Sequence, residues 1–266
     1  MTLQELLKYT LDNEASDLHI TVGIPPMIRK YGKLQAVGEQ KLMPADTEEL
    51  IRSMLNEEQM QRLQEMGEID LSFSLQGLGR FRVNAFKQRG TLSCAIRMVN
   101  LEIPHLSKLG LPESVSALAR KTKGLILVTG PTGSGKSTTL ASMIDQINSE
   151  RACHILTLED PIEYLHRHKK SIVNQREIGH DTKSYSNALR AALREDPDVI
   201  LVGEMRDMET IAIAVTAAET GHLVLSTLHT IGAANTIDRI VDVFPPHQQQ
   251  QIRVQLSMVL QGVISQ

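Results

Sequence analysis

The stretch GLILVTGPTGSGKST, residues 124–138, decides the fold of the larger part of this chain. Its first six residues form an apolar run with the length of a buried strand, and LASMIDQI, residues 140–147, has apolar residues at helical spacing. Between these segments, Gly130, Gly135 and Lys136, followed by a serine, fit the pattern G-x-x-x-x-G-K-[S/T]. A strand, a loop and a helix in this order predict a phosphate-binding loop.

Each residue type in the loop has a chemical reason. Glycines let backbone N–H groups curl around phosphate oxygens, and the helix N-terminus adds positive potential. Lys136 is expected to reach the β and γ phosphates, and the Ser137 hydroxyl to ligate Mg²⁺. The loop therefore predicts a nucleoside triphosphate with magnesium, the alternative being a chance Gly/Ser turn. The predicted nucleotide-binding residues are Gly130, Thr132, Gly133, Ser134, Gly135, Lys136, Ser137 and Thr138.

Acidic residues follow two other apolar runs. Glu204 comes after DVILV, and Gly203 stands where P-loop proteins usually carry an aspartate. The segment LEDPIEY supplies Glu159, Asp160 and Glu163 after HILTL, a strand that we expect beside the P-loop strand. Hydrolysis of a bound triphosphate needs an acid near the metal and a group that orients the attacking water. Either Glu163 or Glu204 would polarise this water, and the other would hold the coordination shell of the magnesium ion. A solvated acidic loop is the alternative for any one of them.

Histidines and arginines add further candidates. His222 precedes the apolar run LVLSTL and His229 follows it, so either one could be a packed or capping residue, while His229 could also sense the γ-phosphate. Arg80, Arg82 and Arg97 lie in the paired strands of the first part of the chain. P-loop enzymes that form rings often use an arginine from a neighbouring subunit. The alternative is that these arginines simply lie on the solvent-exposed face of a strand.

From residue 124 onward, strands alternate with helices, which predicts a mainly parallel sheet covered by helices on both faces. The predicted strands are GLILVT, HILTL, DVILV and HLVLST. The predicted helices cover residues 136–149, 184–194, 208–220 and 233–241, and a last helix is expected over IRVQLSMVLQGVI, residues 252–264.

The first part of the chain reads as a small α+β domain. A helix is expected in LQELLKYTLDNEASD, followed by short strands in DLHITV, PPMIRKYG and KLQAV. Two helices, ADTEELIRSML and EEQMQRLQEM, then precede strands in IDLSFSL and RFRVNAFKQRGTLSCAIRMV. We therefore predict a domain over residues 1–99, a linker over residues 100–121 that contains NLEIPHLSKLGLP, and a second domain over residues 122–266.

Composition excludes several other classes. The net charge is −3 and the 28 Lys and Arg residues are spread along the 266-residue chain, so we expect no nucleic acid partner. Cys94 and Cys153 cannot form a disulfide framework and lack zinc-site spacing, which favours a reducing, cytosolic compartment. No apolar run approaches the roughly 18 to 20 residues of a membrane span, so we expect a soluble protein without direct membrane insertion.

Taken together, these segments resemble the secretion ATPase superfamily, and within it the type IV pilus retraction ATPases of the PilT family. The resemblance covers essentially the whole chain. SDLHIT and GIPPMIRKYG are similar to the start of the family's N-terminal domain, GRFRVNAFKQRG to its arginine-bearing hairpin, and GPTGSGKST to its Walker A loop. ILTLEDPIEYLH resembles the Asp box, REDPDVILVGEMRD the atypical Walker B segment, and TGHLVLSTLHT the His box.

The resemblance implies a PAS-like N-terminal domain followed by a RecA-like P-loop ATPase domain. It further implies a homo-hexamer in which the N-terminal domain of one subunit caps the nucleotide of the next. The cofactors would be ATP and Mg²⁺, and the partner a pilus platform protein of the inner membrane. The protein would then be cytoplasmic and peripheral at the inner face of that membrane.

The resemblance also implies roles for individual residues. Lys136, Ser137 and Thr138 would bind Mg-ATP. The catalytic candidates are Glu204, Glu163, Arg82, Arg97, His229 and His222. The metal candidates are Ser137, Glu204 and Glu159.

Several relatives remain as alternatives. Pilus assembly and type II secretion ATPases share the motor but usually carry a four-cysteine zinc motif, which two cysteines cannot form. A PilU-like accessory motor and a noncatalytic, nucleotide-dependent scaffold are further alternatives. The family normally continues past VISQ, residues 263–266, into helices associated with retraction, so we expect this chain to be truncated.

Overall fold

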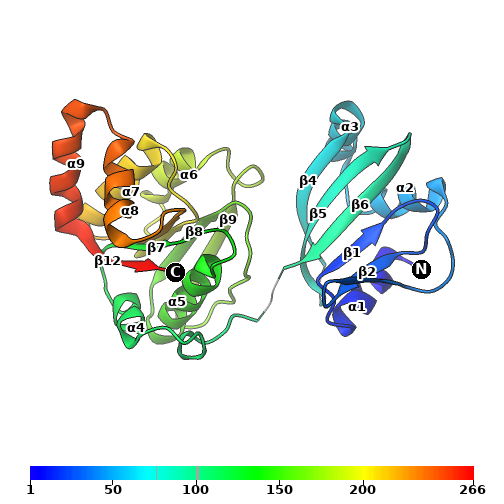
Figure 1. The fold of residues 1–266 in the computed structure, drawn as a ribbon, viewed down its shortest axis with the longest axis horizontal. Coiled ribbons are helices and arrows are strands. Elements are labelled where there is room, and N and C mark those ends of the chain that lie inside the picture. Colours follow the sequence, from blue (N-terminus) through cyan, green and yellow to red (C-terminus); the bar gives the residue numbers. More distant parts are fainter. Residues whose placement is uncertain (76, 100–101) are drawn as a thin grey trace. The chain divides into compact units, whose positions relative to one another are not determined.

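The structure, a computed structural model, describes residues 1–75, 77–99 and 102–266. The chain divides into two compact units, Met1–Asn100 and Leu101–Gln266 (Figure 1). Asn100 and Leu101, at which the predicted linker begins, lie outside the described residues.

In its described residues, the first unit has an antiparallel sheet and three helices. Among its described residues, the strand order is β3-β2-β1-β6-β5-β4 (Figure 1). The strands are β1 (Asp17–Ile20), β2 (Met27–Lys30), β3 (Lys33–Ala36), β4 (Glu68–Leu75), β5 (Gly79–Gln88) and β6 (Thr91–Met98). The helices are α1 (Leu3–Asp12), α2 (Pro44–Arg52) and α3 (Glu57–Met66).

Alternation along the strands of this unit separates an apolar face from a polar one. In β5, Phe81 and Val83 are buried in the core that the helices share, whereas Arg82, one position away, is exposed. Cys94 of β6 also lies in this core, and burial raises the pKa of its thiol to about 12. The thiol is therefore protonated and packs as a small apolar group.

The second unit contains the predicted parallel sheet. Every described strand pair in it is parallel, and the strand order is β12-β7-β11-β10-β8-β9. The strands are β7 (Gly124–Thr129), β8 (His154–Glu159), β9 (Ile172–Glu177), β10 (Val199–Val202), β11 (Leu223–Leu228) and β12 (Leu260–Ser265). The prediction of an α/β fold with a mainly parallel sheet is confirmed.

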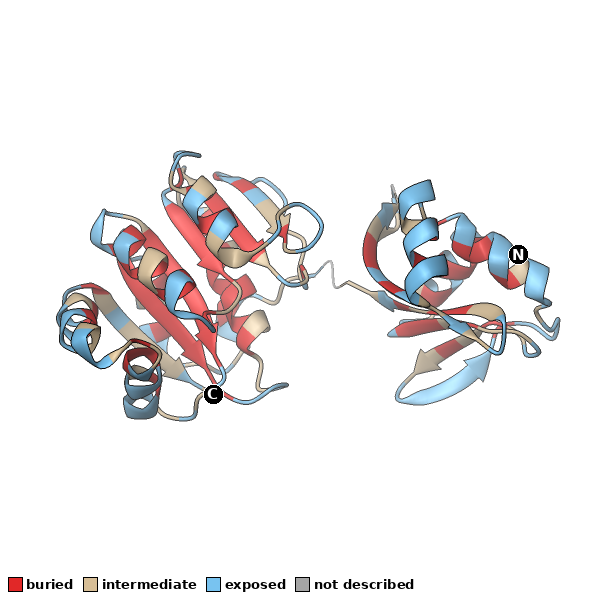
Figure 2. Ribbon diagram, turned by 90° about the horizontal axis from the view of Figure 1, so that it is seen from above, coloured by how far each residue is buried: buried red, intermediate tan, exposed pale blue. Residues whose placement is uncertain are grey.

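Helices cover both faces of this sheet, as predicted. One core joins the sheet to α6 (Tyr185–Ala192), α7 (Met208–Glu219), α8 (Ala233–Asp242) and α9 (Pro246–Val259). A second core joins it to η1 (Leu106–Lys108), α4 (Glu113–Ala119) and α5 (Lys136–Glu150). Figure 2 shows the buried strands between helices whose outer surfaces are exposed. Residues that alternate along one strand, such as Ile126 and Leu127, belong to different cores.

The order of the strands corrects one prediction. HILTL forms β8, but β8 does not lie beside the P-loop strand β7, because β10 and β11 separate them. The neighbours of β7 are β11 and β12. Strand order depends on where each crossover helix returns the chain to the sheet, which local pattern does not determine.

The end of the chain corrects a second prediction. The predicted helix over residues 252–264 ends early: α9 ends at Val259, and the next residues form β12. This strand pairs with β7 along the edge that β11 does not occupy. Gly262 suits this position because a Cβ there would lie 2.9 Å from a methyl carbon of Leu118. Strand β9 was also not predicted. Both missed strands lie at the edges of the sheet.

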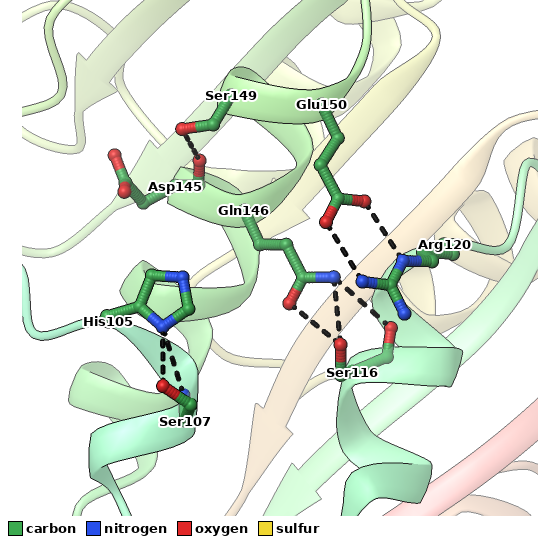
Figure 3. Close-up of polar contacts among 8 residues, drawn as sticks. All are labelled: His105, Ser107, Ser116, Arg120, Asp145, Gln146, Ser149 and Glu150. Atoms are coloured by element: carbon green, nitrogen blue, oxygen red, sulfur yellow. Dashed lines mark hydrogen bonds and ion pairs between the residues drawn. The ribbon is translucent and has the colours of Figure 1, made fainter.

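The described part of the predicted linker is instead integrated into the second unit. Leu106 and Val115 are buried in its core. Polar contacts reinforce this packing (Figure 3): Arg120 donates two hydrogen bonds of 3.0 Å to Glu150, and the Gln146 amide donates to the Ser116 hydroxyl at 3.0 Å. Residues 102–121 therefore brace α5, the helix that begins at the P-loop.

Candidate active site

The glycine-rich loop connects the carboxyl end of β7 to the first turn of α5. Gly135 caps this helix in a left-handed conformation, with a φ of 99°. Among the described residues, no side chain caps the helix. The backbone N–H groups of its first turn are therefore available to an anion, which is what a phosphate site at a helix N-terminus requires.

Lys136 lies inside this loop. The residue is only 8% exposed, and its Nζ donates hydrogen bonds to the backbone carbonyls of Gly130, at 3.0 Å, and Pro131, at 2.8 Å. Burial lowers the pKa of the ammonium group, while the carboxylates of Glu163 and Glu204 oppose that shift. The ammonium group is thus held next to the loop, where a phosphate would compete with two neutral carbonyls for it.

A cavity of about 490 Å³ opens at this edge of the sheet. That volume is within the range for a small-molecule site. The cavity brings together most of the predicted loop residues and five other predicted side chains. The predicted residues that line it are Thr132, Gly133, Gly135, Lys136, Ser137, Thr138, Glu159, Asp160, Glu163, Glu204 and His229. Gly130 and Ser134 belong to the loop but do not line the cavity.

Glu204 is anchored at the end of β10. One carboxylate oxygen lies 2.7 Å from Nε of Arg206, and the other lies 3.5 Å from Nε2 of His229. The Glu204 side chain is 19% exposed. A carboxylate held from both sides has a fixed direction, which suits a group that orients water or a metal shell.

Glu159 and Glu163 differ in their surroundings. One oxygen of Glu159 accepts hydrogen bonds from the Thr157 hydroxyl at 2.5 Å and the Gln175 amide at 3.1 Å. Burial raises the pKa of Glu159, and these hydrogen bonds oppose the shift. Glu163, by contrast, is exposed and lines the same cavity. Glu159 is therefore engaged with protein neighbours, and Glu163 faces solvent.

The two histidines lie at opposite ends of β11. His229 lines the cavity. His222 lies where β7 and β11 begin, since its carbonyl accepts from the N–H of Gly124 at 3.0 Å. Its Nδ1 lies 2.9 Å from the carbonyl oxygen of Ala217, at the end of α7. The structure therefore does not bring His222 to the cavity of its own unit, and the contact fits a capping role.

Arg82 and Arg97 are cross-strand neighbours in the first unit. Together with Asp17 and Asp70 they line a cavity of about 330 Å³. Nε of Arg97 lies 3.0 Å from a carboxylate oxygen of Asp17. Burial by itself would raise the pKa of Asp17, but hydrogen bonds from Ser16 and Arg97 outweigh it and lower the pKa. The two predicted arginines thus share one polar face of the sheet.

The cavity also contains side chains that the sequence did not single out: Tyr164, His166, Tyr185, Arg206 and Thr227. The hydroxyl of Tyr164 lies 2.9 Å from that of Thr138, so it contacts the P-loop directly. Position gave a signal for two of them. Tyr164 ends the acidic segment LEDPIEY, and Arg206 follows Glu204 by two residues.

His166 gives the folded protein a predictable pH dependence. Among the described residues its buried Nδ1 has no hydrogen-bond partner, and burial lowers its pKa from 6.5 to about 4. The unfolded chain therefore binds the proton more readily, so the stability that His166 contributes above pH 6.5 is lost as the pH falls towards 4.

We expect His166→Gln to reduce this loss, which amounts to at most about 3 kcal/mol by pH 4. Urea denaturation of both proteins between pH 7 and pH 4 measures the difference. His247→Gln, at an exposed histidine of α9, is the control. Parallel pH profiles for wild type and His166→Gln would contradict the assignment.

A phosphate-binding loop at the carboxyl end of a parallel sheet, with carboxylates from two further strands on the same cavity, defines a P-loop nucleoside triphosphatase. Within that class, the chain belongs to the family described as Type II/IV secretion system protein, which matches residues 1–266. The family resemblance found in the sequence is confirmed.

Similarity extends over the full chain. It is 50% identical over 266 residues to the type IV pilus retraction ATPase PilT of Pseudomonas aeruginosa, covering 100% of this chain and 77% of that protein. It is 50% identical over 241 residues to a twitching motility protein of Neisseria gonorrhoeae, covering 91% of this chain and 64% of that protein. The crystal structure of the pilus retraction motor PilT with bound ADP matches with a TM-score of 0.94 and 55% identity, covering 99% of this chain and 77% of that one.

Proposed function

We propose that this chain is the ATPase of a type IV pilus retraction motor. The observation that carries the proposal is that Lys136 of the P-loop lines the same cavity as the carboxylates of Glu163 and Glu204. A P-loop alone binds nucleotide, whereas hydrolysis also needs acids near the metal and the attacking water. Similarity to PilT, a pilus retraction ATPase, supports the direction of the work that hydrolysis drives.

The residues present fit magnesium as well as ATP. Ser137 and Glu204 offer oxygen atoms on the cavity, and Mg²⁺ is usually bound by one or two such groups together with phosphates and waters. Within the described residues, no cluster of three or more His, Cys, Asp or Glu side chains could hold a metal by itself. Magnesium would therefore arrive with the nucleotide and neutralise charge on its phosphates.

The chemistry of the chain's own residues follows from their surroundings. Glu204 has a fixed direction because Arg206 and His229 contact it. Glu163 is exposed to the cavity. One of these two carboxylates would accept the proton of the water that attacks the γ-phosphate, while the other acts on the magnesium shell. Glu159 is the weaker metal candidate because Thr157 and Gln175 already engage it.

We propose that the active species is a homo-hexameric ring in which Arg82 and Arg97 of one subunit act at the nucleotide of the next. The arginines belong to the unit that lacks the P-loop. An arginine supplied in trans can contribute roughly 10³-fold or more to P-loop hydrolysis. His222 would act in this way only from a neighbouring subunit, since it does not reach the cavity of its own unit.

Mixing two inactive variants tests donation in trans. Lys136→Ala loses the P-loop charge, and Arg82→Ala/Arg97→Ala loses the arginines, but a mixed ring contains some interfaces with both intact. We expect ATPase activity to reappear on mixing. Because Arg97 also pairs with Asp17 within the first unit, Arg82→Ala alone is a further variant to mix. No recovery, with mixed rings shown by native mass spectrometry, would contradict the proposal.

Twitching motility tests the cellular function. We expect this chain to restore twitching to a Pseudomonas aeruginosa strain that lacks PilT, and Lys136→Ala to fail. A chimera that adds the part of that PilT outside the matched region is the second arm, because the chain covers 77% of it. If neither protein restores motility while both hydrolyse ATP, the motor serves another role, such as pilus assembly, secretion or an accessory function.

The proposed partner is a pilus platform protein in the inner membrane, contacted from the cytoplasmic side, and no nucleic acid is proposed. Among the described residues, no helix is both long and apolar enough to span a membrane.

A nucleotide-dependent scaffold without turnover is the second candidate. The presence of Glu163 and Glu204 on the cavity disfavours it, because a scaffold has no need of acids beside the phosphates.

A further inference from the structure

We propose that Tyr185 is a positioning residue for ATP hydrolysis, and that position 203 carries glycine in order to seat the Tyr185 hydroxyl against the backbone next to Glu204. The inference rests on the proposed ATPase function. It gives a physical account of Gly203, which stands where P-loop proteins usually carry an aspartate.

The backbone at Gly203 is fixed by its neighbours. Its N–H donates to the carbonyl of Leu158 at 2.7 Å, and its carbonyl accepts from the Thr227 hydroxyl at 2.6 Å. These bonds tie the residue to the two strands that flank β10. Position 203 therefore has little freedom to move away from an added side chain.

Conformation does not explain the glycine. Gly203 is absent from the residues with positive φ, so an L-amino acid could adopt its backbone geometry. Space is what excludes a side chain. A Cβ at position 203 would lie 2.7 Å from the hydroxyl oxygen of Tyr185 and 3.1 Å from the carbonyl oxygen of Leu158. The tyrosine hydroxyl occupies the place that the side chain of residue 203 would need.

Tyr185 is held in this place by the start of α6. Ser184 caps the helix by accepting a hydrogen bond from the N–H of Asn187 at 3.2 Å, which fixes the backbone next to the tyrosine. The ring is partly buried against the core beneath the sheet. The side chain also lines the nucleotide cavity, so its apolar body is packed and its polar end is directed to the site.

The surroundings of the phenol define its chemistry. Burial raises the pKa of Tyr185, and the nearby carboxylates of Asp160, Glu204 and Glu159 raise it further. A phenol has an ordinary pKa of about 10, so the hydroxyl keeps its proton at neutral pH. It is a neutral donor among acceptors, and it cannot serve as the general base.

A neutral donor at this point would direct a carboxylate. In the hydrolysis step, water oxygen bonds to the γ-phosphorus, the bond from that phosphorus to the leaving oxygen of ADP breaks, and a proton passes from water to a glutamate carboxylate. Tyr185 keeps its own proton and would act through Glu204, by holding the carboxylate or its water in line. Loss of the hydroxyl should therefore affect turnover and leave nucleotide affinity unchanged.

Tyr185→Phe tests this directly. We expect kcat to fall about tenfold to a hundredfold, the effect of losing a hydrogen bond that the hydroxyl would donate to a charged group in the ATP-bound site, with KM and ADP affinity within about twofold of wild type. Tyr31→Phe, at a residue that is 83% exposed in the first unit, is the matched control. A wild-type kcat in Tyr185→Phe would overturn the inference while leaving the ATPase function intact. Absence of hydrolysis by the wild-type chain would overturn both.

A double-mutant cycle tests the link to position 203. Gly203→Ala should lower kcat more than Tyr185→Phe does, because the added methyl displaces the phenol and disturbs the strand. In the Tyr185→Phe background the closest obstacle is gone, so adding Gly203→Ala should lower kcat by no more than about threefold. Fully additive effects would contradict the seating of the hydroxyl by glycine.

ADP titration and thermal unfolding of each variant show whether the fold is retained. If Gly203→Ala does not fold, recovery of folding in the double variant provides the same test.

Discussion

Lys136→Ala is expected to abolish measurable ATP binding. The ammonium group is the P-loop side-chain charge that the motif places against the β and γ phosphates, and charge-assisted bonds to phosphate are among the strongest in proteins. Its removal also takes one donor from each of the carbonyls of Gly130 and Pro131, so the loop loses an internal support. We expect affinity to fall by at least about a hundredfold.

Calorimetric titration with ATP and Mg²⁺ measures this loss. Lys123→Ala is the control, because Lys123 is exposed just before β7 and does not line the cavity. Thermal unfolding without nucleotide shows whether the variant remains folded. Wild-type affinity in a folded Lys136→Ala protein would mean that ATP binds somewhere other than at this loop.

Glu204→Gln and Glu163→Gln are expected to bind Mg-ATP and to lose most turnover in at least one case. An amide keeps nearly the same shape as a carboxylate but cannot accept the proton of water. Loss of a general base typically costs a hundredfold or more, so phosphate release should fall by about that factor. The variant with the larger effect identifies the base, and the other acid then belongs to the metal shell.

The control for both variants is Glu113→Gln, at an exposed residue of α4 away from the cavity. The magnesium dependence of each variant separates the two roles, because loss of a metal ligand should raise the magnesium concentration needed for half-maximal activity. If both variants hydrolyse ATP at the wild-type rate, the acids on this cavity are not catalytic and the scaffold alternative gains support.

Local sequence was sufficient for the phosphate loop because all of its parts are contiguous. Strand β7, the glycines, Lys136 and helix α5 follow one another along the chain, so pattern alone predicts their geometry. The sequence also placed the acids after β8 and β10 correctly, at the same edge of the sheet as the phosphate loop. That inference needs only the rule that parallel strands bring their carboxyl ends to one edge.

Long-range features could not be predicted in this way. The order of the strands and the pairing of β12 with β7 depend on contacts between segments far apart along the chain. The same holds for Tyr185, which reaches the cavity from the start of α6 and meets Gly203 only in the folded structure. The sequence showed that Gly203 was unusual, but not which atom fills the space beside it.

His222 shows a consequence of strand direction that the sequence already contained. A residue that precedes a parallel strand lies at the edge opposite to the residues that follow it. His222 and His229 flank the same strand, β11, so only one of them can reach the phosphate edge within a single unit. The structure places His229 there.

The central claim is that the loop over residues 130–138 holds the phosphates of ATP, with Glu204 and Glu163 on the reacting side. The most direct measurement is a crystal structure of this chain with Mg²⁺ and a nonhydrolysable ATP analogue. We predict that Lys136 leaves the carbonyls of Gly130 and Pro131 for the β and γ phosphates, and that Ser137 contacts the metal. A nucleotide bound outside this cavity, or phosphates bound while Lys136 stays on those carbonyls, would contradict the account.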